Sequence, residues 1–391
     1  PPVQVDYRLL ERTGEVPFPS SATIEPTLAC NLECTMCFQN DYRARGIAKE
    51  LGADGLIHVL KSLPRAIRFV YFVGGEVFLR KGFTRMLEAA DAQGIETFVT
   101  TNGTRIGNAD WGVLGRLRHM TGIGFSLDGI GPGHDAVRGA GTYETIVDNI
   151  RRALTLQRTY VSFVMMESNV GHMPEFARTV AGFGVREIGF QHEIYCLPED
   201  LRESRRRLGW TGQDEIMVTV KDRNWASESR LQLAASLATM PALEQECGFV
   251  AAYEPPLPPE TMLSFYDGTI RSTTRLFCRE LTNLFIDPAG NVIHCGFLRK
   301  KFGNVLDQPV EVIWNSAPMR EFRKTLLDGN LLPVCRRCCK LSVWPDGGAP
   351  NPASEEAAGS IPALMMPDRI MKAESVNPVV WENSDSHLLR P

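Results

Sequence analysis

Three cysteines near the start of the chain have the spacing of a metal site. The stretch PTLACNLECTMCFQN (26–40) holds Cys30, Cys34 and Cys37 as C-x3-C-x2-C, and no fourth cysteine follows nearby. Three thiolates can bind three irons of a 4Fe–4S cube and leave the fourth iron open. An open position suits a catalytic metal centre, whereas a structural zinc site would take a fourth ligand from elsewhere. The spacing alone leaves both interpretations open.

A second group of cysteines lies near the C-terminus. The chain has 10 cysteines, of which only Cys196 and Cys247 stand apart from the two groups. In a reducing compartment, such cysteines bind metal or do chemistry more often than they form disulfides. The second group consists of Cys278, Cys295, Cys335, Cys338 and Cys339.

Short apolar runs alternate with helical patterns from about residue 20 to 195. This alternation predicts βαβ units and a parallel sheet of the α/β class, either a partial (β/α)6 TIM-like barrel or an open wound sheet. The predicted strands are 21–27, 67–75, 95–103, 122–129, 160–167 and 185–193. The predicted helices are 49–63, 83–94, 109–119, 142–154 and 173–184.

Polar residues follow the predicted strands where a parallel sheet binds its ligands. The cysteine stretch follows the first strand, and GGE (74–76), TTNG (100–103), SLDG (126–129) and QHE (191–193) end later ones. Because the carboxyl ends of parallel strands meet at one rim, we expect these residues to gather there.

The rest of the chain divides by composition. We expect a lead-in over 1–20, the barrel over 21–196, and a helical bridge or insertion over 197–275 that covers the mouth of the barrel. A cysteine-bearing module follows over 276–344, and 345–391 is expected to be a linker and tail.

The overall composition narrows the class of protein. The 391 residues are 43% hydrophobic and carry a net charge of −4. The chain therefore lacks the excess of positive charge that is typical of proteins that bind nucleic acid. No apolar run is long enough to span a bilayer, and no signal-peptide pattern is present. We therefore expect a cytoplasmic protein that binds neither nucleic acid nor membrane.

The first cysteine group and the strand-end residues together resemble the radical S-adenosylmethionine (radical SAM) superfamily. The resemblance covers roughly residues 20–195, in this order: Cys30, Cys34 and Cys37, then Gly74-Gly75-Glu76, Thr101-Asn102-Gly103, Ser126-Leu127-Asp128-Gly129 and Arg138-Gly139. It implies that SAM chelates the open iron. The reduced cluster then cleaves SAM, and the resulting 5′-deoxyadenosyl radical abstracts a hydrogen atom from the substrate.

The resemblance also implies roles for the residues that would surround SAM. Gly74 and Gly75 would let the backbone approach the ligand, and Glu76 would accept hydrogen bonds from the methionine ammonium. Arg138 would suit a carboxylate. Met36 replaces an aromatic residue often found there, which leaves an apolar contact with adenine but no stacking. The remaining expected SAM contacts are Thr101, Asn102, Ser126 and Asp128.

The C-terminal module resembles the SPASM/twitch type, which carries auxiliary iron–sulfur clusters. A full two-cluster SPASM module needs about seven cysteines and this region has five, so we predict the shortened form with one auxiliary 4Fe–4S cluster. The alternative is a small zinc ribbon. Cys338 fits the C-x2-C spacing better than Cys339, and the predicted ligands are Cys278, Cys295, Cys335 and Cys338.

Four residues are candidates for work on the substrate. His192 and Glu193 end the last predicted strand and could contact substrate or act as acid or base, although such a polar cluster can simply be solvated. Cys196 and Cys247 are candidate hydrogen-atom donors, although lone cysteines are usually small buried residues.

The resemblance leaves the substrate open between two classes. We expect first a small polar metabolite of natural-product biosynthesis (an amino sugar, aminocyclitol or nucleoside), which is dehydrogenated or epimerised, or dehydrated as a further alternative. The second class is a peptide or protein maturase. Only 29 residues precede Cys30, too few for the peptide-binding domain of many such maturases; the sulfatase-maturating type also lacks it. A flavodoxin or ferredoxin is the expected electron donor.

Overall fold

Six parallel strands form the centre of the molecule in the predicted order. The computed structural model describes residues 5–46, 49–210, 216–257, 264–273 and 275–343. Each of the six strands pairs in parallel with the next along the chain, which confirms the partial barrel. They are β1 (Ser21–Ile24), β2 (Phe69–Phe72), β3 (Glu96–Thr101), β4 (Met120–Ser126), β5 (Thr159–Met165) and β6 (Glu187–His192).

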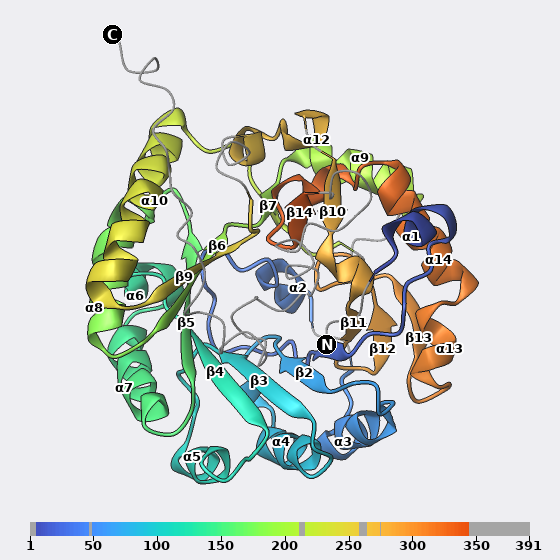
Figure 1. Cartoon of the computed structure of the whole chain (residues 1–391), viewed down its shortest axis with the longest axis horizontal. Helices are drawn as coiled ribbons and strands as arrows, with labels where there is room; N and C mark the ends of the chain where they lie inside the picture. The colour runs from blue at the N-terminus through green and yellow to red at the C-terminus, as the bar shows by residue number, and fades with distance from the viewer. Residues whose placement is uncertain (1–4, 47–48, 211–215, 258–263, 274, 344–391) are drawn as a thin grey trace.

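Helices between these strands cover the outer face of the sheet, which curves around the centre of the molecule (Figure 1). Each buries a stripe at helical spacing; one of them, for example, buries Ile146, Val147, Ile150 and Ala153. The helices are α3 (Ala53–Ser62), α4 (Phe83–Asp91), α5 (Asn108–Leu114), α6 (Pro132–Arg138), α7 (Thr142–Leu154) and α8 (Met173–Gly182).

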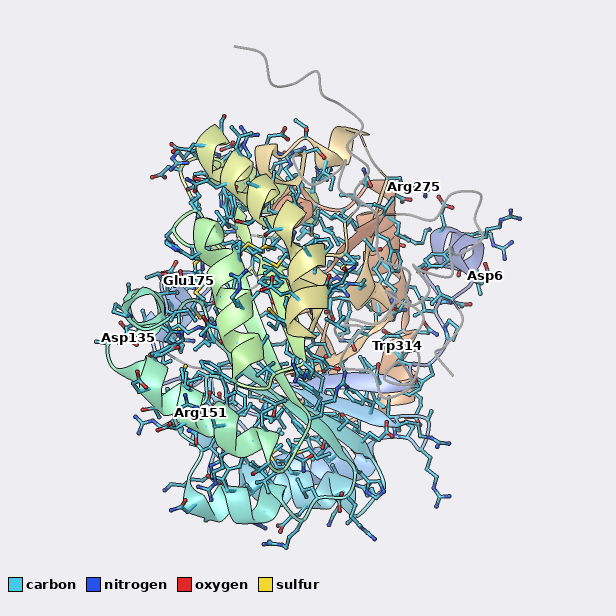
Figure 2. The ribbon with its side chains drawn as sticks, turned by 60° about the vertical axis from the view of Figure 1, so that its left-hand side comes forward. Asp6, Asp135, Arg151, Glu175, Arg275 and Trp314 are labelled. Carbon is cyan, nitrogen blue, oxygen red and sulfur yellow. The ribbon has the colours of Figure 1, made fainter. Side chains whose placement is uncertain are left out.

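The segment expected to be a bridge contributes a seventh parallel strand. Helix α10 (Ser227–Cys247) lies beside α8 on the outside of the sheet (Figure 2). It leads into β9 (Val250–Glu254), which pairs in parallel with β6. The barrel therefore extends beyond the predicted boundary at 196. The strand VAAYE is short and contains two alanines, so its sequence gives only a weak β signal.

The cysteine module continues the sheet at the opposite edge. Strand β11 (Leu284–Ile286) pairs in parallel with β1, and β12 (Asn291–Ile293) and β13 (Lys301–Asn304) follow as antiparallel strands. A separate antiparallel pair joins β10 (Leu276–Cys278) to β14 (Leu341–Val343). The module also contains α13 (Val310–Trp314), α14 (Ala317–Asp328) and the 3-10 helices η3 (Arg279–Thr282) and η4 (Pro333–Arg337).

Shorter elements complete the described chain. Helix α2 (Asn40–Ala44) lies within the curve of the sheet in Figure 1, and α1 (Tyr7–Thr13) packs on α14. The others are η1 (Val77–Leu79), η2 (Val170–His172), β7 (Tyr195–Cys196), α9 (Pro198–Leu208), β8 (Thr219–Val220) and α12 (Ile270–Thr273). The predicted linker and tail over 345–391 lie outside the described residues. Within the described residues, no helix is long and apolar enough to cross a membrane.

Side chains of the parallel strands alternate between two environments. Phe163 and Phe190 contact Phe176 of α8, so their positions face the helices. The neighbouring register, which includes Tyr160, Gly189 and Gln191, faces the inside of the barrel. This alternation decides which strand-end residues can reach a ligand inside the barrel.

Candidate active site at the carboxyl ends of the strands

The loop with the first three cysteines is fastened to the end of β2. The Gly75 N–H donates to the Thr27 carbonyl at 2.9 Å, and the Glu76 N–H donates to the Ala29 carbonyl at 2.7 Å. A Cβ on Gly74 or Gly75 would lie 2.4 or 2.1 Å from these same carbonyl oxygens. The two glycines therefore allow the cysteine loop itself to approach closely, which is a different use from the ligand contact that we expected.

Each thiol of this loop has an N–H donor from a different residue. Asn102 Nδ2 lies 3.7 Å from Cys30 Sγ, and Arg138 Nη1 lies 3.8 Å from Cys34 Sγ. Both terminal nitrogens of Arg43 lie 3.7 Å from Cys37 Sγ. N–H groups aimed at cluster sulfurs stabilise the anionic thiolate and tune the reduction potential of the cluster.

Other groups of the loop and helix α2 fix the Arg43 side chain. Its Nη1 donates to Gln39 Oε1 at 3.3 Å, and its Nη2 donates to the Leu32 carbonyl at 3.2 Å and to Asn40 Oδ1. Arg43 was not among the predicted site residues, because an arginine six residues after the last cysteine carries no signal until α2 turns it back over the loop.

Burial disfavours the thiolate form at this site when no iron is bound. Burial raises the pKa of Cys30, and it raises that of Cys34 to about 11 despite the neighbouring Arg138. Iron that binds here must therefore displace protons from these thiols.

Glu76 acts as an internal clamp between two strand ends. Its fully buried carboxylate accepts hydrogen bonds from Thr101 Oγ1 at 2.6 Å, from the Asn102 N–H at 2.7 Å and from the Phe78 N–H at 3.1 Å. This arrangement holds Asn102 against Cys30. The predicted contact between Glu76 and the methionine ammonium would require the carboxylate to give up one of these partners.

Asp128 anchors Arg138 beside Cys34. Arg138 Nε pairs with the fully buried Asp128 carboxylate, which also accepts the Val164 N–H at 2.6 Å. The Asp128 N–H donates to Nδ1 of His134 at 3.1 Å. Burial lowers the pKa of His134 to about 4, so this imidazole is neutral. Asp128 thus serves as the support for Arg138.

Two other predicted SAM contacts lie near the same rim. Ser126 is partly exposed at the end of β4, on the inner side of the barrel. Met36 is half-buried, and its carbonyl accepts a hydrogen bond from Thr219 Oγ1 at 3.2 Å, which ties the cysteine loop to β8.

His192 does not face the inside of the barrel. It lies opposite Met165 in the register that faces the helices, and it is fully buried against Phe265 and Tyr266. Its Nδ1 lies 2.5 Å from the Tyr266 hydroxyl, and burial lowers its pKa to about 3. Strand alternation turns the ring of His192 outward, so this geometry does not favour the predicted action on the substrate.

Glu193 is engaged in a local network. Its Oε2 accepts from Lys221 Nζ at 2.5 Å and from Trp225 Nε1 at 3.1 Å, and the residue is 3% exposed. We expected a free acid or base, whereas Lys221 and Trp225 both hold this carboxylate.

The two separate cysteines lie away from the inside of the barrel. Cys247 ends α10, where its carbonyl accepts from Arg186 Nη1 at 3.2 Å, next to the first residues of β6 and β9. This is the amino end of the strands, opposite the cysteine loop, so Cys247 cannot donate a hydrogen atom at the predicted site. Cys196 is fully buried at β7, which packs against η4 and Cys335; burial raises its pKa to about 12.

Four cysteines of the C-terminal module line one cavity. Cys278 and Cys295 come from β10 and the turn after β12, and Cys335 and Cys338 come from η4 and its end. Cys339 does not line this cavity, which supports Cys338 as the ligand. The cavity wall also includes Ile194, Phe297, Leu298, Val334 and Leu341, together with His294, Glu280 and Lys340.

The four thiols are more deeply enclosed than the first three. Burial raises the pKa of Cys278 and Cys295 strongly and that of Cys335 to about 11. In the described chain, no three His, Cys, Asp or Glu side chains meet as a group able to hold a single metal ion. The thiols instead surround a space, and a cube that takes one thiolate at each iron fits such a donor set.

Comparison with known proteins agrees with this geometry. A model of the radical SAM superfamily matches residues 24–180, and a model of the SPASM iron–sulfur cluster-binding domain matches residues 278–339. The chain therefore contains a radical SAM domain and a SPASM iron–sulfur cluster-binding domain. Its cofactors are accordingly SAM, the 4Fe–4S cluster of the radical SAM domain, and auxiliary iron–sulfur in the SPASM domain.

The curated relatives of this chain include proteins that are named for maturation. The mycofactocin maturase MftC of Mycolicibacterium smegmatis is 29% identical over 372 residues, which cover 88% of this chain and 85% of that protein. The sporulation killing factor maturation protein SkfB of Bacillus subtilis is 25% identical over 214 residues, about half of each protein.

Solved structures share the fold. Streptococcus suis SuiB bound to SAM superposes with a TM-score of 0.59 at 14% identity, over 82% of this chain and 71% of that one. The SAM-bound protein anSMEcpe gives a TM-score of 0.57 at 17% identity, over 78% of this chain and 82% of that one.

Proposed function

We propose that this radical SAM enzyme is a maturase that modifies a C–H position of a peptide. The similarity that carries the proposal is the one to mycofactocin maturase, because it extends over most of both chains and includes the SPASM region. SkfB and the subtilosin biosynthesis protein AlbA, both from Bacillus subtilis, have names that point the same way. The solved structures that share this fold include Streptococcus suis SuiB bound to its precursor peptide SuiA, which supports the proposal.

The small polar metabolite that we predicted first as the substrate has less support. It depended on the short segment before Cys30, whereas the relatives that match over most of the chain are named as maturases. Pre-heme d1 synthase of Dinoroseobacter shibae is 29% identical over 181 residues, 44% of this chain, which keeps a small-molecule substrate as the second candidate.

We assign the two cysteine groups to two separate clusters. Cys30, Cys34 and Cys37 would hold the cluster that, when reduced, cleaves SAM to the 5′-deoxyadenosyl radical. Asn102, Arg138 and Arg43 would orient and polarise its thiolates. Cys278, Cys295, Cys335 and Cys338 would hold one auxiliary cluster in the enclosed cavity.

The outcome of hydrogen abstraction remains a prediction. An auxiliary cluster is compatible with dehydrogenation of the substrate. Epimerisation needs a hydrogen-atom donor inside the barrel, and neither Cys247 nor Cys196 is there. We therefore favour oxidation of the peptide over epimerisation, with a flavodoxin or ferredoxin as the electron donor.

A turnover screen tests the substrate class. The reconstituted protein, SAM and a reductant would be incubated anaerobically in D2O with two panels: short peptides, including those encoded beside the gene, and amino sugars and nucleosides. Mass spectrometry would follow 5′-deoxyadenosine and every candidate substrate. We expect a peptide to change mass while the small molecules stay unchanged. Turnover confined to an amino sugar or nucleoside would overturn the proposal.

A further inference from the structure

The inside of the barrel is closed toward the amino ends of the strands. Phe69, Phe98 and Tyr160 are buried inward-facing residues that form an aromatic cluster separate from the main core, with the rings of Phe98 and Tyr160 6.3 Å apart. The aromatic cluster forms the floor of the barrel. Gly189 completes this floor by letting Tyr160 lie against its backbone, since a Cβ on Gly189 would lie 1.4 Å from the Tyr160 hydroxyl.

Above this floor the inward-facing side chains enclose accessible space. The Tyr71 hydroxyl bonds Thr100 Oγ1 at 2.8 Å just above Phe98. Outward-facing residues at the same level, such as Phe72 and Val99, are fully buried, whereas several inward-facing ones are partly exposed. Partial exposure inside a barrel means that water reaches them, so they line a chamber. These residues are Tyr71, Thr100, Ser126, Ser162, Val164 and Gln191.

The seventh strand adds a buried carboxylate to the chamber wall. Glu254 pairs with Gln191 in the register that faces inward, and it is only 6% exposed. Its Oε2 lies 3.8 Å from Lys340 Nζ, and its Oε1 lies 3.5 Å from Arg279 Nη2. Oε1 accepts no hydrogen bond from any described residue, although it is buried. Arg279 and Lys340 compensate the charge of this carboxylate, but Oε1 still lacks a hydrogen bond, which a donor group of a ligand could supply.

We propose that this chamber binds the side chain of the peptide residue to be modified, and that Glu254 selects a side chain ending in an O–H or N–H donor. The inference rests on the proposed peptide substrate. A donor would give Oε1 a hydrogen bond, whereas an aliphatic side chain would leave it without one and a carboxylate would meet a like charge. The hydroxyl and amide groups of Thr100, Ser126, Ser162 and Gln191 offer further partners to such a polar group.

Matched peptide pairs test this selectivity. The probes are N-acetylated, C-amidated Gly-X-Gly peptides, with X as tyrosine or phenylalanine, threonine or valine, and lysine or norleucine. Binding to the reconstituted full-length protein with SAM would be measured anaerobically by saturation-transfer NMR. We expect the donor-bearing member of at least one pair to bind about tenfold more tightly than its apolar isostere.

Variants of Glu254 connect the selectivity to this carboxylate. Glu254→Leu should abolish the preference within the pair. Glu254→Gln keeps an acceptor oxygen, so it should retain the preference for tyrosine or threonine and lose that for lysine over norleucine. The matched control is Glu187→Gln, because Glu187 faces inward at the floor and pairs with Arg158. Iron content and the melting temperature would confirm that each variant is folded.

The outcomes separate this inference from the proposed function. Equal binding of the two members in all three pairs would overturn the inference and leave the peptide proposal standing. An unchanged preference in Glu254→Leu would also overturn it. If no peptide binds but an amino sugar does, the peptide proposal fails, and the inference fails with it.

Discussion

The two cysteine groups differ in what surrounds their sulfur atoms. Around the three-thiol loop, side-chain N–H groups of Asn102, Arg138 and Arg43 lie within 3.8 Å of the sulfurs, and those of the two arginines belong to cationic guanidinium groups. Around the four-thiol cavity the wall is largely apolar, and burial strongly raises the pKa of Cys278 and Cys295. At the first site these donors partly offset the burial that raises the pKa of Cys30 and Cys34, whereas the second site mainly excludes water.

This difference agrees with the two roles proposed for the clusters. A cluster that must bind SAM at an open iron needs access from the barrel, and Cys30 and Cys37 are both partly exposed. A cluster ligated fully by protein needs no open position, and three of its four cysteines are buried. The number of thiols and their exposure therefore lead to the same assignment.

The largest expected effect follows loss of the three-thiol loop. Replacement of Cys30, Cys34 and Cys37 by alanine should abolish 5′-deoxyadenosine formation, because the iron that would bind SAM is lost. Chromatography of the anaerobic reaction would measure this product. Cys247→Ala is the matched control and should keep wild-type activity, because Cys247 lies at the amino ends of the strands. Retained SAM cleavage in the triple variant would refute the assignment.

Loss of an auxiliary ligand should separate the two sites. Cys278→Ala or Cys295→Ala should lower the iron content by about one cluster and leave SAM cleavage in place, while peptide modification is lost. Iron analysis and EPR spectroscopy would follow both clusters. Cys339→Ala is the control, since its thiol does not line the cavity. An unchanged iron content in Cys278→Ala would contradict the auxiliary site.

A smaller effect is expected from Arg43. In Arg43→Met the cluster should still assemble, but its reduction potential should become more negative, because the cationic donors beside Cys37 are gone. An EPR-monitored redox titration measures this shift. Arg43→Lys keeps the charge without the planar fork and should give an intermediate potential. A potential unchanged in Arg43→Met would show that the contact has no electrostatic role.

The smallest expected effect concerns stability and the histidine behind the three-thiol loop. The pKa of His134 falls from 6.5 to about 4 on folding, so the unfolded chain binds a proton before the folded chain does. The contribution of His134 to the free energy of unfolding is complete above about pH 6.5. It decreases by about 1.4 kcal/mol per pH unit as the pH falls toward 4.

Denaturant unfolding tests this pH dependence. The urea midpoint between about pH 4 and pH 6.5 should depend less on pH in His134→Gln than in the wild type, by about one proton. His172→Gln is the control, because the His172 side chain is 74% exposed. Equal slopes for the wild type and His134→Gln would contradict the neutral, buried state of His134.

The order of elements and the cysteine positions could be predicted from local patterns. Strand and helix signals alternate regularly up to β6, and Gly74 and Gly75 end a strand where a close approach occurs. The direction of individual side chains could not be predicted as easily. His192 and Glu193 both follow the last predicted strand, yet alternation turns His192 outward, and only the register of β5 and β6 reveals this.

Long-range contacts explain the other residues that were missed. Glu254 reaches the chamber because α10 returns the chain to start a seventh strand, and Arg43 reaches Cys37 because α2 folds back over the loop. The pairing of β11 with β1 joins residues more than 250 positions apart. Such contacts depend on the folded sheet, and no local pattern in the sequence reports them.

Transfer of a labelled hydrogen atom tests the central claim most directly. A peptide identified in the turnover screen would be prepared with deuterium at its carbon-bound positions and incubated with the enzyme, SAM and reductant in ordinary water. We predict that 5′-deoxyadenosine gains deuterium and that the modified peptide loses it in equal amount. Unlabelled 5′-deoxyadenosine beside an unmodified peptide, with label transferred only from a deuterated small metabolite, would contradict the account.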